Sequence, residues 1–248
     1  SGHSKWSKVK HFKGAIDAKR GKLFTKLTKE IIVAVRMGGG RTEGNSRLRH
    51  AVTTARAASM PKENIERAIK KGTGELQGEI IEECVFEGYG PGGVAVLVEV
   101  TTDNRNRTVS DLRNLFKTGG GTLAEAGSVS WMFTQCGQLL FDQQKYPEDK
   151  VMEVALETGA QDVVASDGMV EVITSLGDVY KVKESFERVG MHPESAGLGF
   201  IPKSSVTVEK TEAEKLLRLL ETLEDHDDVQ KVHSNFEVDE KILAQLTQ

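Results

Sequence analysis

The chain has 248 residues, of which 38% are hydrophobic, 28% charged and 6% aromatic. This apolar content suffices for hydrophobic cores and excludes a mainly disordered chain. No apolar run reaches the ~18 residues of a membrane-spanning helix, and the basic N-terminus lacks the apolar segment of a signal peptide. Cys84 and Cys136 form no CxxC pair, which argues against a disulfide scaffold or a zinc ribbon. We therefore expect a cytoplasmic protein without a membrane partner.

The formal net charge of −4 conceals a strong asymmetry along the chain. Residues 1–72 hold 18 of the 33 Lys and Arg but 5 of the 37 Asp and Glu, a local charge of +13, whereas residues 73–248 carry −17. A region this basic attracts polyanions, and the sequence favours such a partner. The alternative is a basic region that docks on the acidic part of its own chain or of a second copy.

Helical patterns dominate the basic region. Residues 1–20 are interrupted by Gly and Ser and form either an arm or a weak helix. Apolar residues recur every four positions over 23–37, which predicts a helix that ends at the following glycines. A second helix is expected from Ser46 and a third over 61–72, with Pro61 in its first turn. We expect these three helices to form a bundle.

Beyond a Gly-rich linker the apolar period changes from 3.6 to 2. Residues 94–100 alternate as a strand, and we expect them to pair with residues 80–87 through a turn at 88–93. A helix that begins near Thr108 and a strand at 129–133 are predicted next.

The second half of the chain predicts a compact α/β unit followed by a helix and a strand. The predicted strand, helix, strand, strand, helix, strand order is ferredoxin-like, with elements at 138–141, 148–158, 162–165, 169–174, 178–189 and 199–208. A helix at 212–223 and a strand at 229–238 have no partners of their own. We infer that they return to the sheet that begins at residue 80.

The predicted fold class is α+β with three domains. Residues 1–76 form the basic arm and a three-helix domain. Residues 77–135 and 205–248 form a discontinuous, sandwich-like α/β domain. Residues 136–204 form an inserted ferredoxin-like β-α-β-β-α-β domain.

The sequence carries no convincing catalytic or cofactor motif. Residues 88–93 match GxGxxG by spacing, but a strand pattern follows where a dinucleotide site needs a helix, so a hairpin turn is the better interpretation. There is no P-loop, and the six histidines lack metal-ligand spacing. We expect no catalytic residue, no metal site and no cofactor.

Two stretches have the chemistry of nucleic-acid contact. Lys and Arg bind phosphates by displacing counterions, and Trp6 can stack on an unpaired base or, equally, pack on the bundle. The candidates in the basic region are Lys5, Trp6, Lys8, Lys10, Lys13, Lys19, Arg20, Lys22, Lys26, Arg47, Arg49, Lys62, Arg67, Lys70 and Lys71. For each single Lys the alternative is a solvated helix face.

The second stretch is the predicted loop 101–108, where Arg105 and Arg107 can contact phosphates. The same residues can also start a helix, with Thr108 as its N-cap. The acidic stretch 221–228 is either a solvated helix end or a segment that repels nucleic acid.

Eight motifs occur in order along the chain: Gly2-His-Ser-Lys-Trp6, Asp17-Ala-Lys-Arg-Gly-Lys22, Phe24-Thr-Lys26, Gly38-Gly-Gly40, Met60-Pro-Lys-Glu-Asn-Ile65, Glu87-Gly-Tyr-Gly-Pro-Gly-Gly93, Thr102-Asp-Asn-Arg-Asn-Arg-Thr108 and Gly127-Ser-Val-Ser130. Through them the chain resembles the YebC/PmpR family, whose mitochondrial member is the translational activator of cytochrome c oxidase subunit I. The resemblance implies the same three domains and a cytoplasmic, non-enzymatic protein. It implies either DNA-binding transcriptional regulation or a role in translation, on the ribosome or mRNA.

Our leading hypothesis is a nucleic-acid-binding regulator of gene expression without catalysis, whose partner is duplex DNA or ribosomal or messenger RNA, with the ribosome as a further partner. The second helix carries Arg47, Arg49 and Arg56 but no Asn or Gln on the same face, which favours shape- or RNA-directed binding over an operator sequence. The alternative is a protein-interaction module whose basic region docks on an acidic surface. The sequence leaves the oligomeric state open.

Overall fold

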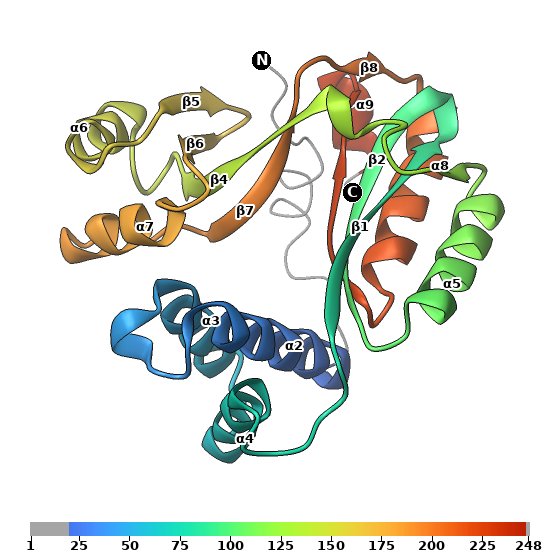
Figure 1. The fold of residues 1–248 in the computed structure, drawn as a ribbon. Helices are drawn as coiled ribbons and strands as arrows, with labels where there is room; N and C mark the ends of the chain where they lie inside the picture. The colour runs from blue at the N-terminus through green and yellow to red at the C-terminus, as the bar shows by residue number, and fades with distance from the viewer. Residues whose placement is uncertain (1–19, 247–248) are drawn as a thin grey trace. The chain divides into compact units, whose positions relative to one another are not determined.

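The computed structural model describes residues 20–246, which form a mixed α+β fold (Figure 1). The described chain divides into two compact units: one is Phe133–Ile201, and the other comprises the residues on either side of that segment. The predicted α+β class is therefore confirmed. Among residues 20–246 no helix is both long and apolar enough to cross a membrane.

Three helices at the start of the described chain enclose a hydrophobic cluster of their own. They are α2 (Arg20–Gly38), α3 (Ser46–Ala57) and α4 (Lys62–Thr73), with a short 3-10 turn, η1 (Thr42–Gly44), before α3. Ile31, Leu48 and Ile65 place one apolar side of each helix in this cluster. Asn45 caps α3 by accepting a hydrogen bond from the Leu48 amide at 3.0 Å, and its side-chain nitrogen donates to the carbonyl of Ala34 in α2 at 2.8 Å.

The same unit contains a four-stranded antiparallel sheet in the order β3-β1-β2-β9. Its strands are β1 (Glu82–Gly90), β2 (Val94–Thr102), β3 (Thr122–Ala124) and β9 (Val229–Ser234). β9 pairs with β2, so the tail of the chain returns to this sheet as predicted. β1 and β2 are joined by a tight turn, Pro91–Gly93, in which Gly92 and Gly93 have φ values of +78° and +75°. The GxGxxG run is thus a hairpin turn.

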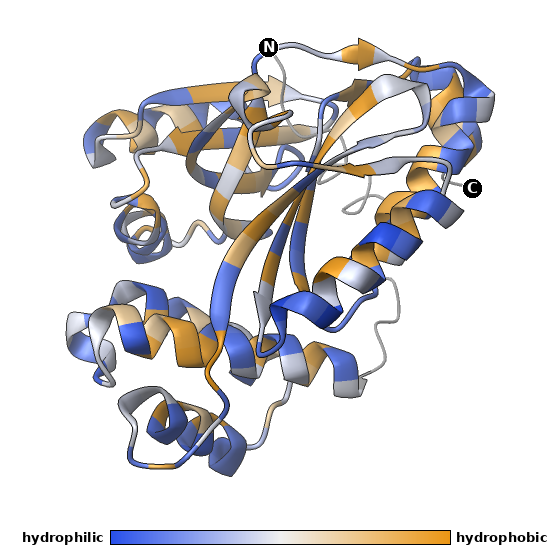
Figure 2. Cartoon of the chain, turned by 45° about the vertical axis from the view of Figure 1, so that its right-hand side comes forward, coloured by the Kyte–Doolittle hydropathy of each residue, from blue (hydrophilic) through white to orange (hydrophobic). Residues whose placement is uncertain are grey.

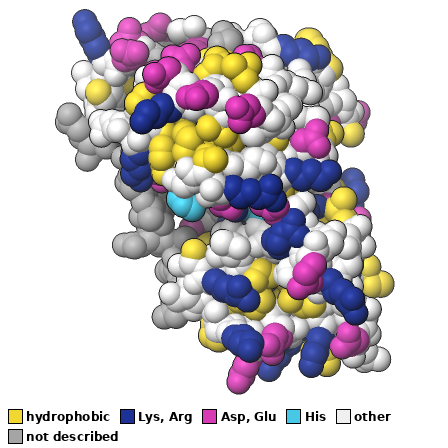
Figure 3. Space-filling model, turned by 90° about the vertical axis from the view of Figure 1, so that its left-hand side faces the viewer, with side chains coloured by type: hydrophobic (Ala, Val, Ile, Leu, Met, Phe, Trp, Pro, Cys, Tyr) yellow, Lys and Arg dark blue, Asp and Glu magenta, His cyan; other side chains and the backbone are white. Residues whose placement is uncertain are grey.

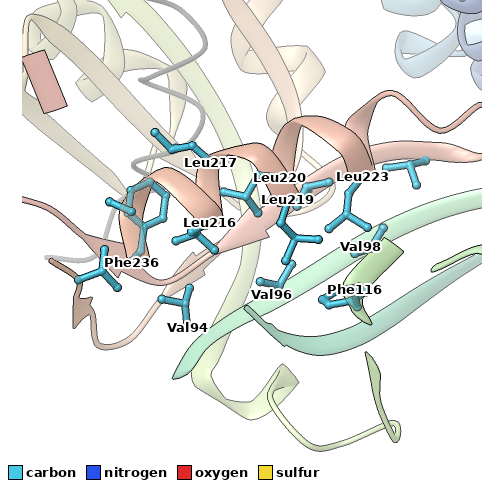
Figure 4. Packing of buried hydrophobic residues seen from close by; sticks show 14 of the residues in the cluster. Val94, Val96, Val98, Phe116, Leu216, Leu217, Leu219, Leu220, Leu223 and Phe236 are labelled. Carbon is cyan, nitrogen blue, oxygen red and sulfur yellow. The ribbon is translucent and has the colours of Figure 1, made fainter. Parts of the chain in front are cut away.

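Two helices cover one face of this sheet. They are α5 (Arg105–Thr118) and α8 (Lys210–Glu224). Leucines along one side of α8 point toward alternate valines of β2, and Phe116 of α5 completes the cluster (Figure 4). Hydrophobic and hydrophilic positions alternate along α5 accordingly (Figure 2). Gly119 lies where a Cβ would come within 2.7 Å of Leu219, so its lack of a side chain lets the end of α5 approach α8.

Two predicted strands of this unit differ from the structure. In the predicted strand 129–133, residues 130–132 form a 3-10 turn, η3 (Ser130–Met132), and a strand begins only at Phe133. The strand predicted over 229–238 is broken after β9, because the Asn235 side chain accepts a hydrogen bond from the Ala95 amide at 2.8 Å. The chain then forms β10 (Phe236–Glu237), which pairs in parallel with β8 (Val206–Thr207), and ends in α9 (Glu240–Leu246). The short strand β3 was not predicted.

The second unit has its elements in the order β-α-β-β-α-β. They are β4 (Phe133–Asp142), α6 (Glu148–Thr158), β5 (Asp162–Ser166), β6 (Met169–Thr174), α7 (Val179–Arg188) and β7 (Ser195–Pro202). The strands are arranged β5-β6-β4-β7. Phe141 of β4 and Val172 of β6 share one buried cluster with Val151 of α6 and Phe186 of α7, so both helices cover the same face. β7 starts before the predicted residue 199 because Leu198 packs on this cluster.

Candidate nucleic-acid interface

The structure describes ten of the seventeen candidate side chains. Lys5, Trp6, Lys8, Lys10, Lys13 and Lys19 lie outside the described residues, as does the side chain of Arg20. Arg105 and Arg107 lie in the first turn of α5 and not in a loop. The N-cap of α5 is Asn104, whose side-chain oxygen accepts from the Arg107 amide at 3.1 Å, so the predicted Thr108 cap is wrong.

Lysines on one side of α2 contact the C-terminal end of α8. Lys22, Lys26 and Lys29 follow each other at spacings of four and three, which places them on one face of the helix. Carbonyl groups at a helix C-terminus lack partners within the helix and carry partial negative charge, so ammonium groups are favourable there. The ammonium groups donate to the carbonyl oxygens of Asp225 (3.0 Å from Lys22), Glu224 (contacting Lys26) and Asp227 (3.3 Å from Lys29).

Directly after this helix end, Asp228 joins α2 to α5. Its carboxylate lies 2.8 Å from Lys29 Nζ and 3.1 Å from Arg107 Nη2, and it accepts a hydrogen bond from Thr108 Oγ1 at 2.8 Å. The side chain of Asp228 is only 5% exposed. Arg107 also contacts Asp103 at 2.9 Å. The two predicted basic stretches therefore meet, but at a carboxylate of the same chain.

The pKa values of this cluster reflect burial and close partners. Burial raises the pKa of Asp228, but hydrogen bonds from Lys29, Thr108 and Arg107 outweigh it and hold the pKa at about 2. Burial lowers the pKa of Lys26, and the nearby acidic residues of α8 and the following turn offset that change only in part. Asp228 is therefore a carboxylate at neutral pH.

The candidate arginines of α3 also have partners within the fold. Arg47 Nε lies 2.9 Å from Glu30 Oε1, and its Nη2 lies 3.1 Å from Glu83 Oε1. Burial opposes the charge of Arg47, but these two carboxylates outweigh it and raise the pKa of the guanidinium. Arg49 donates to the carbonyl groups of Thr42 and Glu43, the latter at 3.0 Å. These arginines hold α3 against α2, η1 and β1.

Of the candidate cations of α4, Lys62, Arg67 and Lys70 are exposed and Lys71 is half-buried. Lys62 lies 3.7 Å from Glu66 in an exposed pair. Arg67, Lys70 and Lys71 have no ion-pair partner within the part of the chain that the structure describes. Arg105 is exposed and lies 5.5 Å from the centre of the Phe86 ring. On the face drawn in Figure 3, Lys and Arg side chains lie among Asp and Glu and do not form a continuous basic surface.

The residues described by the structure contain no cluster of His, Cys, Asp and Glu that could hold a metal ion. Cations either contact carboxylates and carbonyls of the chain itself or remain available to an external anion.

Two family models together match most of the chain. Residues 4–75 match the TACO1/YebC protein N-terminal domain, and residues 81–236 match the TACO1/YebC second and third domain. The chain belongs to the TACO1/YebC family.

Close relatives in this family are named as regulators. Proteins from Syntrophobacter fumaroxidans and Desulfotalea psychrophila, each called a "probable transcriptional regulatory protein", are both 55% identical to the chain. The first alignment covers 99% of each protein and the second 100% of each. The crystal structure of a conserved hypothetical protein from Aquifex aeolicus has a TM-score of 0.83 and 48% identity, and the match covers 90% of this chain and 93% of that one.

Two motifs of this TACO1/YebC chain, 87–93 and 127–130, are brought together by one carboxylate. Glu87 accepts hydrogen bonds from the amides of Gly127 at 2.6 Å, Val129 at 2.9 Å and Ser130 at 2.6 Å. Burial raises the pKa of Glu87, but these amides outweigh it and lower the pKa below its usual range. Because the protein's own carboxylate occupies the amides, this part of the family pattern stabilises the fold.

Three residues that form the contacts described above were not among the candidate residues of the sequence. Lys29 continues the spacing of Lys22 and Lys26 on α2, and that helical period would have identified it. Asp228 lies in a run of acidic residues, and no local pattern distinguishes it from its exposed neighbour Asp227. Glu87 carries no local signal of its contact with residues 127–130.

Proposed function

We propose that this chain is a non-enzymatic, nucleic-acid-binding regulator of gene expression that uses its basic N-terminal region to bind phosphates. The observation that carries the proposal is the local charge of +13 over residues 1–72 in a chain whose remainder is acidic. Membership in a family whose relatives are named transcriptional regulators supports a nucleic-acid partner. Cations without an internal partner attract a polyanion by releasing its bound counterions.

The contact surface we propose comprises α4, Arg105 and the N-terminal segment. On α4, Arg67, Lys70 and Lys71 are available to phosphates because no carboxylate of the described chain pairs with them. The N-terminal candidates add six positive charges to the same region of the sequence: Lys5, Lys8, Lys10, Lys13, Lys19 and Arg20, with Trp6 among them. Arg47, Arg49 and Arg107 contribute mainly to the fold, since they contact oxygen atoms within it.

The engaged arginines of α3 favour recognition of shape over reading of base edges. A recognition helix presents free Arg, Asn or Gln side chains to the major groove. Arg47 and Arg49 are held by internal acceptors, which supports binding to phosphates of ribosomal or messenger RNA and a role in translation. The names of the relatives support duplex DNA and transcription instead. We propose cytoplasmic action in either case.

We further propose the three-domain division of residues 1–76, residues 77–135 with 205–248, and residues 136–204, the last being a ferredoxin-like insertion. Three separate hydrophobic clusters support it, one in the helical region, one beneath α5 and α8, and one in Phe133–Ile201. The family descriptions also distinguish an N-terminal, a second and a third domain.

Fluorescence anisotropy with a labelled single-stranded RNA and a labelled DNA duplex tests the function. Contact with ~6–10 phosphates predicts that affinity falls ~10³- to 10⁵-fold between ~50 and ~200 mM salt. Replacing Lys5, Lys8, Lys10 and Lys13 by Gln should weaken binding and flatten this dependence. An affinity that changes neither with salt concentration nor with these substitutions would reject the proposal. Competition by purified ribosomes then separates the two roles, because capture by the duplex alone rejects the role in translation.

A second candidate is the protein-interaction module. The observation in its favour is that α2 lysines already contact the acidic end of α8, so part of the positive charge serves a protein surface. In that case the full chain would bind neither probe, and substitutions in α2 would change only its stability.

A further inference from the structure

The contact between the α2 lysines and the end of α8 has a buried inner part and an exposed outer part. In the inner part, Lys29 and Asp228 are 2.8 Å apart, with side chains only 13% and 5% exposed. In the outer part, Lys22 and Asp225 are 3.7 Å apart between charged atoms, with side chains 38% and 70% exposed. Lys26 lies between these pairs and donates to the carbonyl of Glu224.

These two parts differ in how easily another anion can replace the acidic partner. Removing one partner of a buried pair leaves an uncompensated charge, so the Lys29–Asp228 contact is expensive to open. An exposed pair contributes little, because water and salt solvate both groups after separation. A phosphate oxygen can therefore take the place of Asp225 at Lys22 while Lys29 and Asp228 keep α2 attached to α8.

We propose that Glu224 and Asp225, at the acidic end of α8, compete with nucleic-acid phosphates for Lys22 and Lys26 and thereby limit binding. This inference rests on the proposed function and concerns the regulation of the same site. The outer contacts to Asp225 and Glu224 occupy both lysines before nucleic acid arrives. Binding through these lysines requires that their contacts to Glu224 and Asp225 break, while the inner Lys29–Asp228 pair stays closed.

The competition has a consequence for salt dependence. A phosphate that binds a solvated lysine releases counterions from the nucleic acid, which makes affinity fall as salt rises. When the phosphate instead displaces Asp225 from Lys22, the freed carboxylate takes up a cation from solution. The net release is smaller, so neutralising the carboxylate should steepen the salt dependence by up to about 0.9 in the logarithmic slope for each lysine concerned.

The first test compares two double substitutions of equal charge change in the full chain. Asp225→Asn with Asp227→Asn removes exposed carboxylates at the α8 end. Glu214→Gln with Glu240→Gln removes exposed carboxylates of α8 and α9 that contact no lysine of α2. With a labelled single-stranded RNA or DNA duplex, the first variant should bind about two- to fivefold more tightly, because it removes the exposed Lys22–Asp225 pair. Equal affinities of the two variants would overturn the proposal.

A double-mutant cycle separates competition from general repulsion. If Asp225 acts by occupying Lys22, the gain in affinity from Asp225→Asn should disappear when Lys22→Gln is also present. A gain that persists in the Lys22→Gln background means that Asp225 repels nucleic acid at a distance, and the competition is rejected. Thermal unfolding of each variant verifies that the fold is retained, which the exposure of both side chains leads us to expect.

The proposed function and this inference fail in different ways. If no variant binds either probe in a salt-dependent manner, the proposed function is wrong and the inference fails with it. If the wild-type chain binds and Lys22→Gln weakens binding, but Asp225→Asn with Asp227→Asn matches its control, then the function stands. The acidic end is then a structural clamp and the competition is rejected.

Discussion

Lys29 and Asp228 are 199 positions apart in the sequence, yet their charged groups lie 2.8 Å apart with little access to solvent. The same carboxylate accepts from Thr108 and contacts Arg107, so it connects α2 with the start of α5 and the start of β9. The cohesion of the basic helices with the acidic sheet domain therefore depends on a buried charge cluster as well as on apolar packing.

Substitution of Asp228 by Ala should destabilise the chain strongly. It leaves the Lys29 ammonium buried without its carboxylate and removes the acceptor of Thr108, so we expect a loss of about 3–5 kcal/mol. Urea unfolding, monitored by circular dichroism, measures this loss in the free energy of unfolding. The matched control is Asp227→Ala, because Asp227 is exposed and adjacent. Equal unfolding midpoints for the two variants would show that the cluster contributes nothing.

The cluster also predicts how stability depends on pH. The pKa of Asp228 is about 2 in the folded chain against 3.8 for the ordinary side chain, a depression caused by partners that outweigh burial. A depressed folded pKa stabilises the fold above pH ~4, and this contribution disappears as pH falls from ~4 through ~2. Over that range the wild type should lose about 2 kcal/mol more than Asp228→Asn. If the free energy of unfolding changed with pH in the same way in both proteins, the depressed pKa of Asp228 would be contradicted.

Much of the fold follows from local patterns. The helices at 148–158 and near 62–73, and the strand at 169–174, agree with their predicted ranges because hydrophobic period, Pro and Gly all lie within the segments themselves. The strand predicted at 129–133 is wrong because Glu87, more than forty positions earlier, takes up the amides of this segment. A period of two cannot reveal a partner so distant.

The candidate site was less predictable than the fold for a similar reason. A count of Lys and Arg gives the charge of a region, but not which cations already have a partner. Arg47 and Lys70 are equivalent in the sequence pattern, yet Arg47 contacts two carboxylates and Lys70 faces solvent. Only the tertiary structure brings Glu30 and Glu83 together around Arg47.

The substitution Glu87→Gln tests the connection between the two family motifs. A glutamine offers one oxygen acceptor, and its amide nitrogen would face backbone N–H donors, so at least one of three amides would lose its partner. We expect a loss of about 1–3 kcal/mol and faster hydrogen exchange at Val129 and Ser130. The exposed Glu125→Gln is the control. Unchanged exchange at both amides would mean that the carboxylate does not hold this turn.

The cations of α4 that have no ion-pair partner among the described residues give the most direct test of the nucleic-acid interface. Replacement of Arg67, Lys70 and Lys71 by Gln should weaken binding to RNA or DNA and lower the salt slope by about 1 for each lost phosphate contact. Stability should hardly change, because these side chains have no ion-pair partner among the described residues.

The control for this triple variant removes the same charge from a different surface of the same unit. In this control, Gln replaces Lys215, Arg218 and Lys241, which are exposed on α8 and α9. If only the net charge mattered, the loss of three positive charges would weaken binding equally in the two variants, since long-range attraction depends on the sum of charges. If the interface lies on α4, the α4 variant should lose more affinity than the control variant, and its affinity should depend less steeply on salt. Equal slopes would place the phosphate contacts outside α4.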